Sequence, residues 1–234
     1  MLDGIMIVKP DEIEKKSMEI ITSELGERTW PEEEFLVVKR CIHTAADFDY
    51  ADNLVFSEGA VKRAREAIMA GADIVTDTNM AAAGINKKAL ARWGGSVHCF
   101  MAEEDVAREA KEKGVTRASV CMERGAALQE AVLPKTAPQE TVPQETAPQE
   151  SGLRRPVIFA VGNAPTALIR LYEMMKEGRV TPALIIGAPV GFVNVVESKE
   201  LILSTSVPYI VARGRKGGSN IAAAICNAIL YQCQ

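Results

Sequence analysis

The chain has 234 residues, of which 47% are hydrophobic, 25% charged and only 5% aromatic. A net charge of −4 and few aromatic side chains disfavour a surface for nucleic acid or anionic membrane. The five cysteines are scattered, and no Cys or His spacing is typical of zinc, so we expect neither a metal site nor a disulfide framework. No signal peptide or membrane-spanning apolar run is visible, and we expect a cytoplasmic protein.

The first half of the chain alternates between helical and strand patterns. Helices are predicted over residues 10–25, 31–42, 58–71 and 102–114, with three glutamates opening the second and Ser57 capping the third. Short apolar runs predict strands at residues 53–57 (NLVFS), 72–78 (ADIVTDT) and 96–101 (SVHCFM).

The second half continues the alternation. Strands are predicted at residues 156–162, 183–191 and 208–214, and helices begin at Pro165, between the last two strands, and at Ser219. Such alternation predicts an α/β fold: a single domain with a mostly parallel open sheet flanked by helices, of Rossmann-like topology. Ligands of such sheets bind beyond the carboxyl ends of the strands, which nominates the loops TDTNM, VGNAPT, IGAPVG and ARGRKGGS.

One segment differs in composition. Residues 136–150 (TAPQETVPQETAPQE) repeat a five-residue unit three times and are rich in Pro, Gln and Glu. Such a segment cannot bury a hydrophobic face, so we expect a disordered or partly polyproline tether at about 133–155 within one domain spanning 1–234. A tolerated loop insertion is the preferred interpretation, and a spacer or interaction tail is the other.

Several polar residues stand out against apolar patterns. Ser17 shares a helix face with isoleucines, where its hydroxyl either bonds its own backbone or points into a ligand cavity. His98 lies in an apolar strand and is expected to be a core histidine. Arg40 and His43 are three residues apart on one helix face, which fits either a surface contact or a functional pair.

The loop GRKGGS places small residues and backbone N–H groups before a helix. This arrangement suits a carboxylate or a phosphate, but the loop lacks the spacing of a dinucleotide or P-loop motif. An anion cradle and a plain tight turn therefore both remain open.

Arg40-x-x-His43, followed in order by GNAPTAL, GAPVGFV, ESK and RGRKGGS, closely resembles the precorrin-8 methylmutase family, including its cobalt-precorrin-8 members. The resemblance covers nearly the whole chain outside the 136–150 repeat. It implies an isomerase of cobalamin biosynthesis that moves a methyl group from carbon 11 to carbon 12 of a corrin precursor. It also implies that the reaction uses no cofactor.

The resemblance further implies roles for individual residues. His43 matches the family's general acid, which protonates a ring nitrogen of the macrocycle. Substrate contacts are expected at Ser17, Arg40, Arg117, Asn163 and Gly217. The family also implies a homodimer with its site near the subunit interface, and precorrin-8 or cobalt-precorrin-8 as substrate.

Two other classes of function remain as alternatives. A tetrapyrrole-binding carrier would use the same surface without chemistry. A nucleotide-dependent α/β enzyme would use GRKGGS as a phosphate loop.

Overall fold

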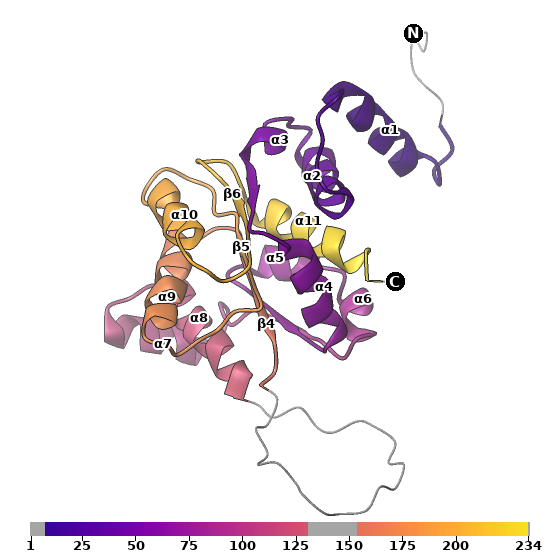
Figure 1. The fold of residues 1–234 in the computed structure, drawn as a ribbon. Helices are drawn as coiled ribbons and strands as arrows, with labels where there is room; N and C mark the ends of the chain where they lie inside the picture. The colour runs from indigo at the N-terminus through magenta and orange to yellow at the C-terminus, as the bar shows by residue number, and fades with distance from the viewer. Residues whose placement is uncertain (1–7, 131–153, 234) are drawn as a thin grey trace, which may run out of the picture.

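Six strands form one sheet in the computed structural model, which describes residues 8–130 and 154–233 (Figure 1). The order across the sheet is β1-β6-β5-β4-β2-β3. The strands are β1 (Leu54–Phe56), β2 (Asp73–Thr76), β3 (Val97–His98), β4 (Val157–Val161), β5 (Leu184–Gly187) and β6 (Tyr209–Ala212). All neighbouring pairs are parallel except β1 and β6, so the prediction of a mostly parallel sheet is confirmed.

Helices cover both faces of the sheet (Figure 1). One face carries α2 (Glu32–Ala45), α4 (Ala60–Met69), α5 (Asn79–Gly84), α6 (Lys87–Ala91) and α11 (Ser219–Leu230). The other carries α7 (Glu104–Lys113), α8 (Arg117–Ala127), α9 (Pro165–Lys176) and α10 (Val195–Leu203), with the short helix η1 (Leu128–Glu130) after α8. Outside these layers, α1 (Ile13–Leu25) packs on α2, and α3 (Tyr50–Asn53) leads into β1.

Strand β4 shows why the sheet strands are continuous apolar runs. All five of its residues are buried. Ile158 and Ala160 pack in the core beneath α2, α4 and α11, whereas Val157, Phe159 and Val161 pack in the core beneath α7 to α10. Because successive side chains point to opposite faces, a strand covered on both sides must be apolar at every position.

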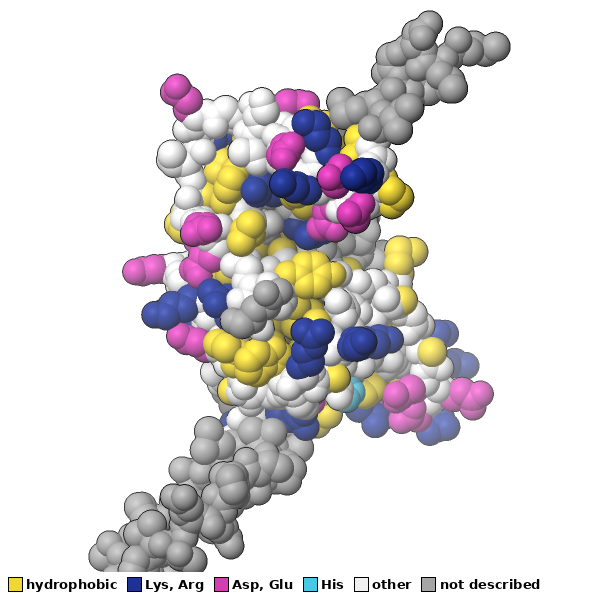
Figure 2. Space-filling view, turned by 90° about the vertical axis from the view of Figure 1, so that its right-hand side faces the viewer, with side chains coloured by type: hydrophobic (Ala, Val, Ile, Leu, Met, Phe, Trp, Pro, Cys, Tyr) yellow, Lys and Arg dark blue, Asp and Glu magenta, His cyan; other side chains and the backbone are white. Residues whose placement is uncertain are grey.

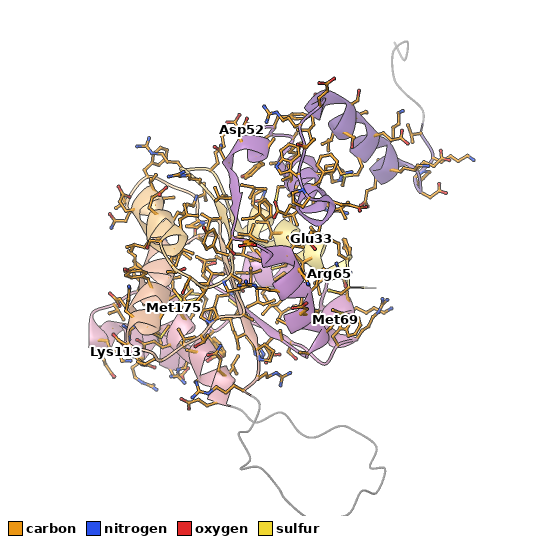
Figure 3. The ribbon with its side chains drawn as sticks, in the orientation of Figure 1. Glu33, Asp52, Arg65, Met69, Lys113 and Met175 are labelled. Carbon is orange, nitrogen blue, oxygen red and sulfur yellow. The ribbon has the colours of Figure 1, made fainter. Side chains whose placement is uncertain are left out.

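Salt bridges tie some of the helices together. Glu33 of α2 and Arg65 of α4 point toward each other, with Oε2 and the guanidinium 3.9 Å apart (Figure 3).

Figure 2 shows basic and acidic side chains interspersed on the side of the molecule where α1, α4 and α6 lie, so this surface carries no extended basic patch. Along the described ranges, the chain forms no helix with the length and hydropathy needed to cross a bilayer.

The predicted elements differ from the observed ones mainly at their ends. The first helix begins at Ile13 rather than at Pro10, and α2 continues past Ile42 to Ala45, so His43 lies in its last turn. Ser57 does not cap α4, since its hydroxyl accepts a hydrogen bond from the Tyr209 N–H at 2.9 Å and ties β1 to β6.

Four short or alanine-rich helices, α3, α5, α6 and α8, have no counterpart among the predicted elements. Helix α8 begins after Thr116, whose hydroxyl accepts the Ser119 N–H at 3.2 Å. This cap satisfies one of the free backbone N–H groups at the start of the helix.

The predicted tether lies mostly outside the described residues, which resume at Arg154. Arg155, expected to belong to it, is part of the folded domain. Its Nε lies 2.9 Å from a carboxylate oxygen of Asp73, and its guanidinium donates to the Gly94 carbonyl at 2.7 Å. Arg155 is therefore tied to the residues around β2 and β3 before β4 begins.

His98 occupies a less buried position than expected. It ends β3 at the edge of the sheet, with 28% of its side chain exposed. Its Nε2 faces Asp73 at 3.4 Å, and its ring stacks on Phe100 with centroids 6.0 Å apart. Because β3 has a neighbouring strand on one side only, His98 is half-buried. The expectation of a histidine in the core is therefore wrong.

Candidate active site

The loops that follow β2, β4, β5 and β6 meet at the carboxyl edge of the sheet. These four strands are neighbours and run parallel, so their carboxyl ends lie in a row. The loops that follow them are the ones that the sequence predicts to bind a ligand. The contacts between the loops determine which of the candidate residues are brought together.

Asp77, directly after β2, organises the loop after β4. Its fully buried carboxylate accepts hydrogen bonds from the backbone N–H groups of Gly162, Asn163 and Ala164 at 2.8, 2.9 and 2.6 Å. Burial raises the pKa of Asp77 above its ordinary value, and the three hydrogen bonds oppose that rise. The carboxylate thereby fixes the backbone at Asn163, while the Asn163 residue itself stays exposed.

The same segment also holds the start of α11. The Thr78 hydroxyl lies 2.8 Å from the Ser219 hydroxyl. Gly162 approaches Ser219 so closely that a Cβ atom on Gly162 would lie 2.7 Å from the Ser219 Cα. A glycine is therefore required where the β4 loop passes the first turn of α11.

Lys199 of α10 supports the loop after β6 from below. The side chain is fully buried, and its ammonium donates to the carbonyls of Gly214 and Lys216, each at 2.8 Å. Burial lowers the pKa of Lys199 to about 8. A buried lysine bonded to backbone carbonyls fixes the path of that loop.

Gly217, in the same loop, lies against the end of β5. A Cβ atom there would lie 2.2 Å from the Ala188 carbonyl oxygen. The neighbouring Gly218 N–H donates to that oxygen at 2.8 Å. Gly217 thus has a packing role that the sequence did not reveal, beside any contact with a ligand.

Lys216 joins this loop to the segment that follows His43. Its ammonium lies 2.6 Å from carboxylate oxygens of both Asp47 and Asp49. These two hydrogen bonds raise the pKa of Lys216, and the bond from Lys216 lowers the pKa of Asp47. The end of α2 is therefore tied to the carboxyl edge of the sheet.

His43 is exposed in the last turn of α2, four residues before Asp47. Ala46 follows the helix in the left-handed conformation (φ 51°), and its N–H donates to the Ile42 carbonyl at 2.7 Å. Around His43, α2 is firmly packed, because Cys41 and Ile42 are completely buried. The imidazole is thus a solvent-accessible group on a rigid support.

Arg40 lies one turn earlier and is already engaged. Its guanidinium is 2.7 Å from Glu14 of α1 and 5.3 Å from the centroid of the Tyr231 ring. These contacts hold α1 and the end of the chain against α2. Arg40 and His43 share a helix face, but within residues 8–130 and 154–233 no hydrogen bond joins their side chains.

Ser17 shows the local arrangement that a helical serine commonly adopts. Its hydroxyl donates to the Ile13 carbonyl at 3.0 Å, one turn back in α1. The residue is half-buried and lies on the outer helix. The structure therefore does not place Ser17 with the loops at the sheet edge.

Arg117 lies near the loop after β4, because the first turns of α8 and α9 are in contact. It opens α8, directly after Thr116, whose hydroxyl is 2.8 Å from that of Thr166 in the first turn of α9. Arg117 and Asn163 are both exposed beside this junction. Of the six predicted residues, these two and Gly217 therefore belong to the carboxyl edge, and His43 is tied to it through Lys216.

A cavity of about 730 Å³ lies between α7, α8 and α9, and Thr116 and Thr166 are among its lining residues. Its charged lining residues neutralise one another: Lys113 and Arg170 both bind Glu123, at 2.9 and 2.7 Å. Lys113 lies across the sheet from Glu33 of α2 (Figure 3). None of the six predicted residues lines this cavity, and its paired charges do not suit a flat apolar ligand.

Sequence reasoning missed Asp77 and Lys199. Asp77 carries a signal that could have identified it, because a carboxylate directly after a buried parallel strand faces the loops at that edge. The only sequence signal for Lys199 is its position in the ESK motif. Its two carbonyl partners could not be predicted, because they depend on how α10 packs against the β6 loop.

Comparisons with known proteins are consistent across the chain. The model of the precorrin-8X methylmutase family matches residues 12–232. The cobalt-precorrin-8 methylmutase of Priestia megaterium is 38% identical over 224 residues, covering 96% of this chain and 88% of that protein. The enzyme of the same name from Salmonella typhimurium is 38% identical, covering 96% of both chains.

A solved structure has the same fold. The crystal structure of precorrin-8x methyl mutase from Thermus thermophilus superposes with a TM-score of 0.77 at 34% identity, covering 95% of this chain and 97% of that one. The match includes both halves of the sheet, on either side of residues 131–153.

Proposed function

The chain belongs to the precorrin-8X methylmutase family, a family of isomerases of cobalamin biosynthesis, and we propose that His43 is its general acid. The proposed reaction moves a methyl group from carbon 11 to carbon 12 of precorrin-8 or cobalt-precorrin-8. The bond from the methyl group to carbon 11 breaks as the bond to carbon 12 forms. No external methyl donor takes part in this rearrangement.

The observation that carries the proposal is the placement of His43. It is an exposed imidazole on a buried helix, and Lys216 joins the segment after it to the loops at the carboxyl edge of the sheet. A proton delivered to a ring nitrogen would draw electron density from the macrocycle and favour migration of the methyl group. A rigid helix would hold the acid in place while the ring is bound.

The substrate proposed here is a flat, apolar ring fringed with carboxylates. Arg117 and the Asn163 side chain are exposed at the edge where β4 ends, and their donors would bind such carboxylates. Arg40 would contribute after exchanging Glu14 for a substrate carboxylate. Gly217 would allow the ring to approach the backbone of the β6 loop, and Ser17 would join the site only from a second subunit or after α1 moves.

A homodimer is also proposed, with the site near its interface. Ile13 and Ile20 of α1 and Leu36 of α2 are exposed by 52%, 44% and 40%. These large apolar side chains are exposed on two helices that pack on each other, and a partner subunit would cover them. Light scattering of the purified protein would measure the state directly, and a monomer at micromolar concentration would contradict the dimer.

We also propose that the protein is cytoplasmic. Four of the five cysteines are buried, and the pKa values of Cys41, Cys121, Cys226 and Cys233 are raised by burial. Buried, protonated thiols fit a reducing compartment.

The proposed function is tested by mixing the protein with precorrin-8 and with cobalt-precorrin-8 and recording absorption spectra. The rearrangement changes the conjugation of the macrocycle, so conversion gives a new spectrum that persists after the protein is removed. Binding that leaves the substrate unchanged after extraction would favour the alternative, a tetrapyrrole carrier.

A further inference from the structure

The loops after β5 and β6, residues 188–194 and 213–218, form one structural unit, here called the β5/β6 platform. The Gly191 N–H donates to the Arg215 carbonyl at 3.3 Å, and the Gly218 N–H donates to the Ala188 carbonyl at 2.8 Å. Lys199 fixes the platform from below through the carbonyls of residues 214 and 216. The two loops are therefore held in one arrangement before any ligand binds.

The platform exposes large apolar side chains. Phe192 is 82% exposed, Val193 78% and Val190 47%, whereas the strand before them is fully buried. Their loop has a positive φ at Gly191 (142°) and, without a glycine, at Asn194 (56°). Glycine and asparagine both adopt positive φ at low cost, so the sequence of this loop suits the turn that presents Phe192.

Arg215 is the cation of the platform that lies beside these apolar side chains. The Arg215 guanidinium lies 5.5 Å from the centroid of the Phe192 ring. The other two cations bind carboxylates, Arg213 to Glu200 at 2.8 Å and Lys216 to Asp47 and Asp49. Among the described residues, no carboxylate lies within ion-pair distance of Arg215.

We propose that Phe192 and Arg215 bind the substrate macrocycle, the ring of Phe192 against its apolar face and Arg215 on a peripheral carboxylate. This inference rests on the proposed function, which supplies a flat ring with a carboxylate rim. An exposed aromatic ring beside an unneutralised cation matches both parts of that ligand. Neither residue transfers a proton in this proposal. Both contribute to substrate binding, and His43 remains the general acid of the rearrangement.

The inference predicts a graded effect at Phe192 and a salt-dependent effect at Arg215. Phe192→Ala should weaken binding of the reaction product roughly tenfold, because it removes the aromatic contact and its buried area, while Phe192→Tyr should stay close to wild type. Arg215→Gln should weaken binding about two- to fivefold at low salt, and less at high salt. Single-turnover rates at saturating substrate should change little for all three variants.

Matched controls lie away from the platform. Met69→Ala removes a 42% exposed apolar side chain of α4, labelled in Figure 3, and Arg179→Gln removes an exposed arginine that binds Glu177 at 2.9 Å. Both controls should bind the product like the wild type. Product dissociation constants would be measured by fluorescence quenching, with light scattering of each variant at the same concentrations.

The outcomes separate the inference from the proposed function. If the wild type converts the substrate but Phe192→Ala binds product with wild-type affinity, the inference is overturned and the proposed function stands. It is also overturned if affinity falls only where Phe192→Ala dissociates an oligomer, since the platform would then be a subunit interface. A wild type that binds the macrocycle without converting it would contradict the proposed function, while the affinities would still test the platform.

Discussion

Lys199→Met tests whether the buried ammonium of α10 holds the β6 loop. Methionine has nearly the same length and no hydrogen-bond donor, so the change removes two contacts while keeping most of the packing. The carbonyls of Gly214 and Lys216 would lose the donors that now lie at 2.8 Å. We expect lower stability and weaker product binding, because this loop carries Arg215 and Gly217.

The magnitude follows from two opposing effects. Each carbonyl left without its donor costs about 1–3 kcal/mol. Part of this loss is offset, because burying the ammonium is itself unfavourable, as its pKa of about 8 shows. A net loss of about 1–3 kcal/mol lowers the melting temperature of a chain this size by about 2–12 °C.

The pH dependence gives this prediction a signature of its own. With a folded-state pKa of about 8 against an ordinary 10.5, the native protein releases the Lys199 proton while the unfolded chain still holds it. The free energy of unfolding of the wild type should therefore gain from this residue as pH rises from about 8 to about 10.5. A neutral amine still has two N–H groups for the two carbonyls, so the contacts survive the proton loss.

The assay is urea unfolding of wild type and variant at several pH values between 7 and about 10, with product affinity measured at neutral pH. Lys62→Met, at an exposed position of α4, is the matched control and should leave both quantities unchanged. Wild-type stability, an unchanged pH profile and unchanged affinity in Lys199→Met would refute the supporting role of this lysine.

Three further substitutions test the carboxyl edge. Asp77→Asn should cost about 2–4 kcal/mol, since an amide cannot accept all three N–H bonds; urea unfolding measures it, and an unchanged midpoint would contradict it. Gly217→Ala should destabilise by about 1–3 kcal/mol, because its Cβ would overlap the Ala188 carbonyl; a wild-type melting temperature would be the opposing result. Arg117→Ala should raise the product dissociation constant more than it lowers the single-turnover rate, and a collapsed rate with unchanged affinity would place Arg117 with the acid instead.

The layers of the fold could be predicted because strands covered on both faces leave a simple pattern. The runs that became β4 and β5 are apolar at every position, and the helices between them begin at recognisable residues such as Pro165. Helix α8 could not be predicted in the same way. Ala, Ser and Gly fill five of its eleven positions, and the contact with α9 that buries one side of it appears only in the folded chain.

The candidate site was predictable only in part, for a similar reason. The parallel sheet brings the loops after β4 and β6 together, so Asn163 and Gly217 could be nominated from the order of elements. The contacts of Lys199 and Asp77 join residues 15 or more positions apart and appear only in the folded chain. Ser17 shows the reverse case, since its family match suggests a ligand contact while the hydroxyl bonds the Ile13 carbonyl.

The central claim is tested most directly by the single-turnover rate of His43→Ala beside its affinity for product. The variant should fold normally, because His43 is exposed in the last turn of α2 and alanine is well tolerated in helices. Losing a general acid should slow the rearrangement by about 10²–10⁴-fold, while the platform and Arg117 keep the product affinity close to wild type. His98→Ala, at the half-buried edge of the sheet, should retain the rate. A His43→Ala variant that rearranges the substrate at the wild-type rate would contradict the catalytic role assigned to this histidine.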